Sequence, residues 1–393
     1  MKSPANNTIL TITLKTFFGL EEVVIEELKE LGYEEGVVAL NRAVQLKGTW
    51  KDVYFLNLHC RCVITVLVQI AEFDLRQEED LYKQAMKIDW ASLFSVDKTF
   101  AVKGAVFSDL FKHSQYPFLL VKDAIVDAFR KQTGERPNVN VKSPQVLFDL
   151  YIREKKATIS LNTSGTPLFQ RGYRENAGEA PLNEVVAAGL IRMSGWDRKS
   201  TFVDPFCGSG TFLIEAAFLA TGIPSNIERQ HYAFKNLKNY NAELWTEIYE
   251  ASQKRITALP CKIIGGDIND EMILKTRRNL RALPFGRFVE TKSGPFEQFT
   301  SEGESGVMIS NPPYGIRMGD NIEEMYDEIG TWMKHSMSGY ACWILSSSEE
   351  GLKALGLKPD KKFKVYNGEL ECSFRKFSVY DGSKKASKME VDN

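Results

Sequence analysis

The tetrapeptide Asn311-Pro312-Pro313-Tyr314 is the segment of the sequence best suited to chemistry. It follows the apolar run 306–310, which is typical of a buried strand. The Asn311 side-chain oxygen and the Pro312 carbonyl could each accept one hydrogen of a planar amine, and two consecutive prolines would hold both acceptors in place. Tyr314 offers a ring on which an extruded nucleobase could stack. We therefore expect a catalytic segment that directs methyl transfer to a planar nitrogen, with a merely rigid loop as the alternative.

A glycine-rich turn upstream could hold the methyl donor. It lies between a predicted buried strand, 201–204, and a predicted helix that begins at Thr211. Gly208 and Gly210 would let the backbone approach a ligand, and the amides of the helix N-terminus would face a carboxylate. The spacing differs from the Gly-x-Gly-x-x-Gly of dinucleotide enzymes, and a plain strand-to-helix turn is the alternative. The expected cofactor contacts are Asp204, Pro205, Phe206, Cys207, Gly208, Ser209, Gly210 and Thr211.

Two further side chains are expected at the cofactor. Asp267 follows a second predicted strand, where a carboxylate could accept the hydrogens of both ribose hydroxyls. Asp270 is expected to cap the next helix, which would leave Asp267 available for the ribose. Asn311 is expected to contact the cofactor as well as the amine. S-adenosylmethionine suits this arrangement because its sulfonium drives methyl transfer, so no metal is expected. Cys207 lies in the cofactor turn, and we interpret it as a packing residue rather than a nucleophile.

Composition limits the classes of protein that fit. A length of 393 residues predicts two or three domains, and a net charge of -1 gives no overall field to attract nucleic acid. Six cysteines are too few for a disulfide framework. No apolar run approaches the length of a membrane span or a signal peptide. These features predict a cytoplasmic protein without membrane association, in which local patches make any nucleic-acid contacts.

One basic and aromatic cluster could be such a patch. It precedes the cofactor turn and could hold phosphates and stack bases, although ordinary solvated surface is the alternative. The expected RNA-binding residues are Lys155, Lys156, Arg171, Tyr173 and Arg174.

The pattern of predicted elements gives the fold class. The order strand-helix-strand-strand-helix-strand over the first 72 residues predicts a small ferredoxin-like α+β sandwich. Residues 73–165 predict a second small α+β unit with a hairpin near its end. From residue 166 onward strands and helices alternate, which predicts a doubly wound parallel sheet that ends in an antiparallel hairpin. Residues 228–256 are expected to form a helical insertion after the first helix of this last domain.

Several segments together resemble one known group, the bacterial THUMP-domain RNA methyltransferases of the RlmL type, over nearly the whole chain. The matching segments are 121–127, 171–175, 179–184, 204–211, 266–267 and 311–315. The resemblance is to the N-terminal half of these enzymes, which methylate the N2 amine of guanine in 23S rRNA. Members of the group are often labelled as N6-adenine-specific DNA methylases.

The resemblance implies three domains and a function. The domains are a ferredoxin-like domain over 1–72, a THUMP RNA-binding domain over 73–165, and a seven-stranded Rossmann-like methyltransferase domain over 166–393. The implied enzyme uses S-adenosylmethionine to methylate guanine N2 in 23S rRNA, as a monomer or weak dimer. Adenine-N6 methylation of DNA or RNA is the first alternative. A non-catalytic RNA-binding protein with a degenerate methyltransferase fold is the second.

Overall fold

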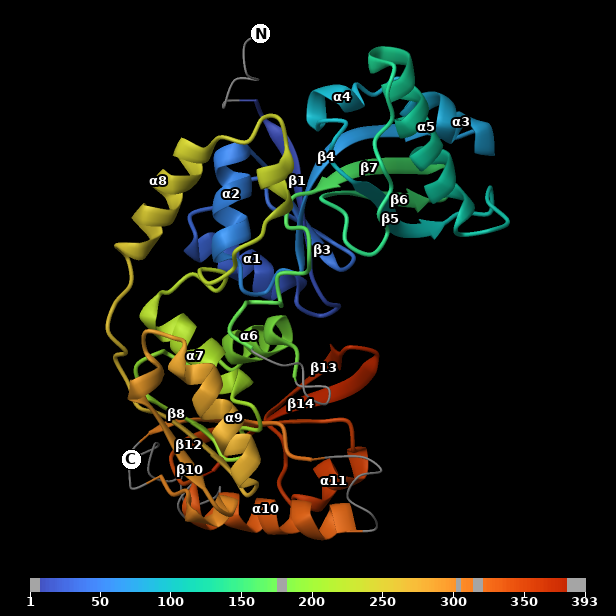
Figure 1. Ribbon diagram of the computed structural model, residues 1–393. Coiled ribbons are helices and arrows are strands. Elements are labelled where there is room, and N and C mark those ends of the chain that lie inside the picture. Colours follow the sequence, from blue (N-terminus) through green and yellow to red (C-terminus); the bar gives the residue numbers. More distant parts are fainter. Residues whose placement is uncertain (1–7, 175–181, 302–304, 314–320, 380–393) are drawn as a thin grey trace. The chain divides into compact units, whose positions relative to one another are not determined.

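The computed structural model describes residues 8–174, 182–301, 305–313 and 321–379, which form two compact units (Figure 1). The first unit holds the described part of the first 16 residues together with Val24–Gln170 and Arg229–Ala251. The second holds Phe17–Val23, Arg171–Glu228 and the described residues from Ser252 onward.

A seven-stranded sheet forms the centre of the first unit, in the order β2-β3-β1-β4-β7-β6-β5. Its neighbours pair antiparallel except β5 and β6, which pair parallel. The strands are β1 Leu10–Lys15, β2 Val38–Leu40, β3 Ala43–Gly48, β4 Thr65–Asp74, β5 Phe100–Phe107, β6 Val146–Arg153 and β7 Lys156–Asn162. The helices are α1 Glu21–Glu30, α2 Trp50–His59, α3 Glu78–Ala85, α4 Trp90–Leu93 and α5 Tyr116–Thr133.

Strand β4 joins two halves that the sequence predicts as separate small units. It pairs with β1 through its first residues and with β7 along most of its length, so the hydrogen-bonded ladder is continuous. The boundary expected after residue 72 therefore falls inside a strand. The predicted strand-helix-strand-strand-helix-strand order holds, and the predicted hairpin corresponds to β6 and β7.

The insertion after the first helix of the predicted last domain belongs to the first unit. It contains the 3-10 turn η1 Ala233–Asn236 and most of helix α8 Ala242–Gln253. The Phe234 ring is fully buried, 4.6 Å from the ring of Tyr54 on α2, and Trp245 lies 5.2 Å from Phe234. Aromatic packing of this kind buries a large apolar area. The predicted domain 166–393 is thus interrupted.

The second unit is built on a sheet in the order β10-β9-β8-β11-β12-β14-β13. The five strands from β10 to β12 run parallel, while β14 is antiparallel to both of its neighbours. This confirms the doubly wound sheet with its antiparallel hairpin. The strands are β8 Thr201–Asp204, β9 Ile263–Asp267, β10 Val289–Ser293, β11 Gly306–Ser310, β12 Tyr340–Ser346, β13 Lys361–Asn367 and β14 Leu370–Ser378.

Helices cover both faces of this second sheet (Figure 1). Three lie on one face, namely α6 Glu184–Met193, α7 Thr211–Thr221 and α9 Asp270–Arg281, and two lie on the other, namely α10 Ile322–Ser336 and α11 Glu349–Ala354. The Tyr326 hydroxyl on α10 donates to Ser346 Oγ at 2.7 Å, and Trp332 Nε1 donates to the Phe299 carbonyl at 2.9 Å. Buried polar groups of α10 are therefore satisfied while its apolar face fills the core.

Gly330 in α10 allows α11 to approach closely. A Cβ at this position would lie 2.0 Å from the Leu355 carbonyl oxygen, which is a backbone atom and cannot rotate away. We expect Gly330→Ala to lower the free energy of unfolding by roughly 2 kcal/mol or more, because the helices must separate. Chemical denaturation monitored by circular dichroism measures this loss.

Gly351→Ala is the matched control. A Cβ at Gly351 in α11 would meet only side-chain atoms, at 3.1 Å. We expect its unfolding free energy to stay within about 1 kcal/mol of the wild type. Equal losses in the two variants would contradict the close approach at Gly330.

Candidate active site

The candidate site lies where neighbouring parallel strands end. Strands β9, β8 and β11 are adjacent, so their carboxyl ends open on one edge of the sheet. Asp267, Asp204 and Asn311 lie at these three ends and line one cavity of about 1560 Å³. This volume exceeds that of a typical small-ligand pocket, so it has room for a second group beside a cofactor. The fold thus brings these three residues together at one cavity, as the sequence predicts.

The glycine-rich turn has the backbone geometry that its glycines predict. Gly208 and Gly210 have φ angles of 54° and 86°, in the left-handed region that side chains disfavour. Gly210 is the N-cap of α7, and a Cβ there would lie 2.8 Å from the Thr276 side chain. The Cys207 amide donates to the Gly266 carbonyl at 2.7 Å, which ties the turn to β9. The turn is therefore fixed from both strands, and its residues Asp204 to Ser209 and Thr211 line the cavity.

Asp204 is a buried carboxyl at the end of β8. It accepts hydrogen bonds from Ser310 Oγ and from the Phe206 amide, the latter at 3.1 Å. Burial raises its pKa from 3.8 to about 7, because the charged form loses hydration, and the two hydrogen bonds oppose this rise. The nearby Asp267 carboxylate adds to it. Asp204 therefore changes protonation state near neutral pH.

Asp267 is tied to the backbone on both sides. Its Oδ2 accepts from the Gly208 amide at 3.0 Å, and its Oδ1 accepts from the Asn269 amide at 2.9 Å. Each carboxylate oxygen can accept a second hydrogen bond, so the side chain retains capacity toward the cavity. The expectation that Asp270 caps the next helix is wrong. Asn269 is the N-cap of α9, and its side chain accepts from the Glu271 amide at 2.9 Å.

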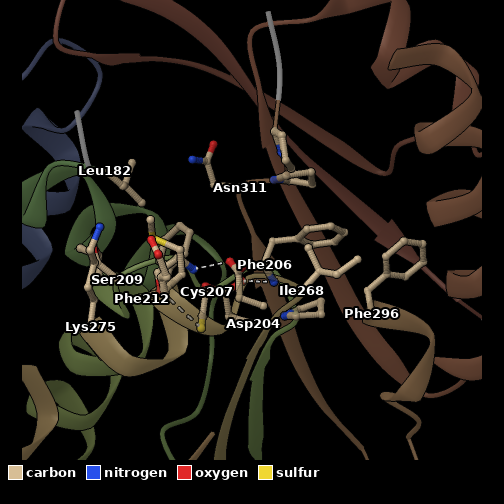
Figure 2. A pocket seen from close by; sticks show the side chains of 18 of the residues that line it. Leu182, Asp204, Phe206, Cys207, Ser209, Phe212, Ile268, Lys275, Phe296 and Asn311 are labelled. Carbon is tan, nitrogen blue, oxygen red and sulfur yellow. Dashed lines mark hydrogen bonds between the residues drawn. The ribbon is translucent and has the colours of Figure 1, made fainter. Parts of the chain in front are cut away.

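Asn311 lines the cavity and carries a buried acceptor. Its Oδ1 is buried and accepts no hydrogen bond from any described residue. In Figure 2 its amide extends from the end of β11 into the cavity, on the side of Leu182. Pro312 is buried and Pro313 is exposed, and both line the cavity. Tyr314 lies outside the described residues.

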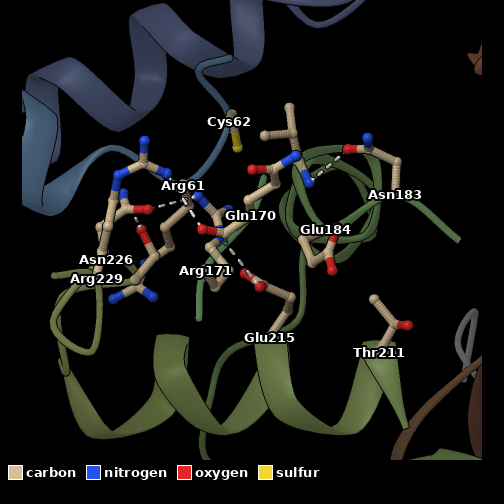
Figure 3. Close-up of polar contacts among 12 residues, drawn as sticks. Arg61, Cys62, Gln170, Arg171, Asn183, Glu184, Thr211, Glu215, Asn226 and Arg229 are labelled. Atoms are coloured by element: carbon tan, nitrogen blue, oxygen red, sulfur yellow. Dashed lines mark hydrogen bonds and ion pairs between the residues drawn. The ribbon is translucent and has the colours of Figure 1, made fainter. Parts of the chain in front are cut away.

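Two of the expected RNA-binding residues are buried. Arg171 is 2% exposed, and its Nε lies 3.3 Å from Glu215 Oε1 on α7 (Figure 3). Tyr173 is 3% exposed and its ring packs against Phe218. The expectation that Arg171 and Tyr173 bind RNA is therefore corrected, because neither side chain reaches the surface. The sequence pattern suggested a solvated cluster, whereas a buried ion pair makes the arginine part of the core.

The other three residues of the predicted RNA-binding cluster lie at two separate places, one at the cavity and two at the β6–β7 turn. Arg174 lines the cofactor cavity, where it donates to Ser209 Oγ at 3.0 Å and to Thr211 Oγ1 at 2.6 Å. The structure thus places Arg174 beside the turn, and its expected RNA-binding role stays a prediction. Lys155 and Lys156 are exposed at the β6–β7 turn, and Lys156 Nζ lies 3.0 Å from Glu72 Oε1. The two lysines remain candidates for RNA contact.

Sequence analysis missed several residues of the site. Ser310 bonds to Asp204, and a small polar residue that ends a buried apolar run was a signal for it. Ile268 is 78% exposed although it is apolar, and it lines the cavity together with Phe296. Asn367, at the turn between β13 and β14, also lines it and accepts from the Asn183 amide at 3.4 Å. No local signal pointed to Asn367, because only the folded sheet brings this hairpin to the cavity.

The donors and acceptors of the cavity fit the expected S-adenosylmethionine. A helix N-terminus without a side-chain cap suits a carboxylate, and Asp204 suits an ammonium group. The exposed Ile268 and the half-buried Phe296 offer apolar surface that suits a purine ring. Burial raises the pKa of the Cys207 thiol well above its usual range, so this thiol stays protonated. The described residues contain no group of three or more His, Cys, Asp or Glu side chains placed to hold a metal. No described helix is long and apolar enough to cross a membrane.

Asp204 predicts how stability depends on pH. The pKa of this carboxyl is higher in the folded state than in the unfolded state. The folded protein therefore binds more protons than the unfolded chain between pH 3.8 and about pH 7. Folding stability attributable to this group therefore falls as pH rises through that window and is constant above it. Relative to Asp204→Asn, we expect the wild type to lose roughly 2 to 3 kcal/mol between pH 5 and pH 8. Urea unfolding across this pH range measures the difference, and parallel curves for the two proteins would contradict the raised pKa.

Comparison with known proteins places a methyltransferase among the relatives of this chain. The chain is 35% identical over 98% of its length to the ribosomal RNA large subunit methyltransferase K/L of Psychromonas ingrahamii, and it covers 52% of that protein. The chain thus spans about half the length of this curated relative. The solved structure of SMU.472 in complex with SAH has 27% identity and a TM-score of 0.85, covering 98% of this chain and 100% of that one.

Other structures show the same fold. A methylase from Clostridium difficile 630 has 28% identity and a TM-score of 0.85, covering 96% of this chain and 100% of that one. TrmN from Thermus thermophilus, at 18% identity and a TM-score of 0.71, covers 94% of this chain and 99% of that one. This last likeness concerns the fold alone.

Three family models match successive parts of the chain. The RlmL ferredoxin-like domain matches residues 11–67 and the THUMP domain matches residues 76–162. The RMKL-like methyltransferase domain matches residues 171–376, more than half of the chain. These matches confirm the resemblance inferred from the sequence. The chain belongs to the family of RMKL-like methyltransferases, with an RlmL ferredoxin-like domain and a THUMP domain ahead of the methyltransferase domain.

Proposed function

We propose that the chain is an S-adenosylmethionine-dependent methyltransferase that acts on the exocyclic N2 amine of a guanine in 23S rRNA. The observation that carries this proposal concerns Asn311, which lines the same cavity as the glycine-rich turn and whose buried Oδ1 accepts no hydrogen bond from the described residues. A buried acceptor without a partner costs free energy, which a ligand with an N–H donor recovers.

The proposed chemistry follows from two acceptors beside a methyl donor. The lone pair of an exocyclic amine is delocalised into the base, so the nitrogen is a weak nucleophile. Asn311 Oδ1 and the Pro312 carbonyl accept the two amine hydrogens and orient the nitrogen. They also stabilise the positive charge that develops as the new N–C bond forms, and the nitrogen then loses a proton to solvent. When bound, S-adenosylmethionine supplies an electrophilic methyl group and leaves as a neutral thioether.

The proposed cofactor contacts use the residues of the turn. Asp204 accepts from the cofactor's ammonium group, the N-terminus of α7 faces its carboxylate, and Asp267 accepts from the ribose hydroxyls. The free lone pairs of Asp267 and the uncapped helix end support these assignments. The SAH in the related SMU.472 structure supports the choice of cofactor. An ammonium group beside Asp204 would lower the pKa of this carboxyl, so cofactor binding near pH 6 should release protons.

The RNA substrate is proposed from the relatives. The Psychromonas protein is a ribosomal RNA large subunit methyltransferase, and in this chain a THUMP domain precedes the methyltransferase domain. We propose Lys155 and Lys156 as RNA contacts of this domain, and the cytoplasm, where ribosomal RNA is made, as its place of action. The choice of guanine over adenine rests on the resemblance to the guanine-N2 enzymes. All the described residues of the cavity belong to one unit of one chain, which suits a monomer or weak dimer.

Asn311→Ala tests the proposed amine acceptor. We expect kcat for methylation of transcribed 23S rRNA to fall by roughly 100- to 1000-fold, because one acceptor for the developing charge is lost. The Kd for S-adenosylhomocysteine should change far less than kcat, since Asn311 is only one of the expected cofactor contacts and the guanine amine is absent from this ligand. Transfer of radiolabelled methyl groups gives kcat, and calorimetry gives Kd.

Asn321→Ala is the control, because Asn321 is an exposed asparagine at the start of α10 that makes no side-chain cap. We expect it to retain wild-type activity. Digestion of the labelled RNA followed by mass spectrometry identifies the product nucleoside. N2-methylguanosine supports the proposal, whereas N6-methyladenosine, or methylation of DNA alone, would overturn the choice of guanine.

A further inference from the structure

Arg174 holds the first turn of α7 from inside the cofactor cavity. Its guanidinium reaches four groups at once: Nε donates to Glu184 Oε1, Nη1 donates to Ser209 Oγ at 3.0 Å, and Nη2 donates to Thr211 Oγ1 at 2.6 Å and to the Leu182 carbonyl at 3.4 Å. The side chain is 16% exposed and lines the cavity. A planar guanidinium spreads its five donors over three nitrogens in a fixed fork, whereas a lysine carries its three donors on one nitrogen at the end of a flexible stem.

Arg174 is the donor in its hydrogen bonds to Ser209 and Thr211, so these bonds do not use the hydroxyl protons of the two residues. A hydroxyl carries one hydrogen and two acceptor lone pairs, so Ser209 Oγ and Thr211 Oγ1 each still have a proton to donate. Neither hydroxyl donates to any other group among the described residues. Both side chains line the cavity, and Thr211 is only 5% exposed. A hydroxyl that accepts from a cation becomes a stronger donor, because the hydrogen bonds polarise one another.

Glu184 fixes the orientation of the guanidinium. It is 7% exposed and lies in the first turn of α6, where the Asn183 side chain caps the helix by accepting from the Val185 amide at 2.9 Å. The ion pair with Glu184 compensates the charge of the largely buried arginine. With Nε committed to Glu184, both terminal nitrogens donate to the hydroxyls of the turn, and Nη2 donates to the Leu182 carbonyl as well.

We propose that Arg174 is a positioning residue for the carboxylate of the bound cofactor. It acts through Ser209 and Thr211, whose hydroxyl protons it directs at that carboxylate beside the uncapped N-terminus of α7. The inference rests on the proposed cofactor and concerns only its amino-acid end. Binding of the adenosine end does not depend on Arg174.

Two ligands distinguish how the amino-acid end and the adenosine end of the cofactor contribute to binding. S-adenosylhomocysteine carries the amino-acid group, and 5′-methylthioadenosine lacks it. Calorimetry on the full chain without RNA should show that Arg174→Gln and Arg174→Lys raise the Kd of S-adenosylhomocysteine by roughly 10- to 100-fold, as expected for loss of charge-assisted hydrogen bonds. The Kd of 5′-methylthioadenosine should change by less than about threefold. Equal losses for both ligands, or no loss for S-adenosylhomocysteine, would overturn the proposal.

A second pair of substitutions keeps the test independent of the arginine. The double variant Ser209→Ala, Thr211→Val retains Arg174 and Glu184 and should weaken S-adenosylhomocysteine to a similar extent. Combining it with Arg174→Gln should add little further loss, because the three residues act as one chain of hydrogen bonds. Additive losses would contradict action through the hydroxyls. A wild-type protein that binds 5′-methylthioadenosine but not S-adenosylhomocysteine would also overturn the inference, whereas failure to methylate RNA would leave it intact and bear only on the proposed substrate.

Discussion

The site depends on keeping the Asn311 side-chain oxygen buried and without a hydrogen-bond donor among the described residues. Such an acceptor typically costs about 1 to 3 kcal/mol, so it persists only where the surrounding structure holds it in place. Here β11 is buried throughout, Ser310 is bonded to Asp204, and two prolines follow the asparagine. An amine hydrogen from a substrate would supply the missing donor. Under the proposed function, the energetic cost of the free protein becomes selectivity for a ligand that carries an N–H group.

The parallel sheet gathers chemically different groups at one edge. Asp204 and Asp267 are both carboxyls at strand ends, yet their surroundings differ. Asp204 is buried with a pKa raised to about 7, while Asp267 accepts backbone amides and remains partly exposed. Two ion pairs link the segment 171–174 of the second unit to its helices. Arg171 pairs with Glu215 on α7, and Arg174 pairs with Glu184 on α6. These ion pairs thus connect the residues beside the proposed cofactor to the helices of the unit.

The catalytic sheet was predictable because its signals are local. The turn from Asp204 to Thr211 and the segment at Asn311 each follow a buried strand, and parallel topology then forces their proximity. The continuous pairing of β4 with both β1 and β7 was not predictable, since pairing partners far apart in sequence leave no local pattern. Arg171 and Tyr173 were misassigned for a related reason. Burial of a charged residue depends on a partner, here Glu215, that is remote in sequence.

A crystal structure of the protein with S-adenosylhomocysteine and a short guanine-containing RNA would test the central claim most directly. The decisive quantity is the distance from Asn311 Oδ1 to the exocyclic nitrogen of the bound guanine. Our account predicts a hydrogen bond of about 3 Å, with the amide facing the cofactor's sulfur. An Asn311 side chain turned away from the base, or hydrogen-bonded within the protein, would contradict it.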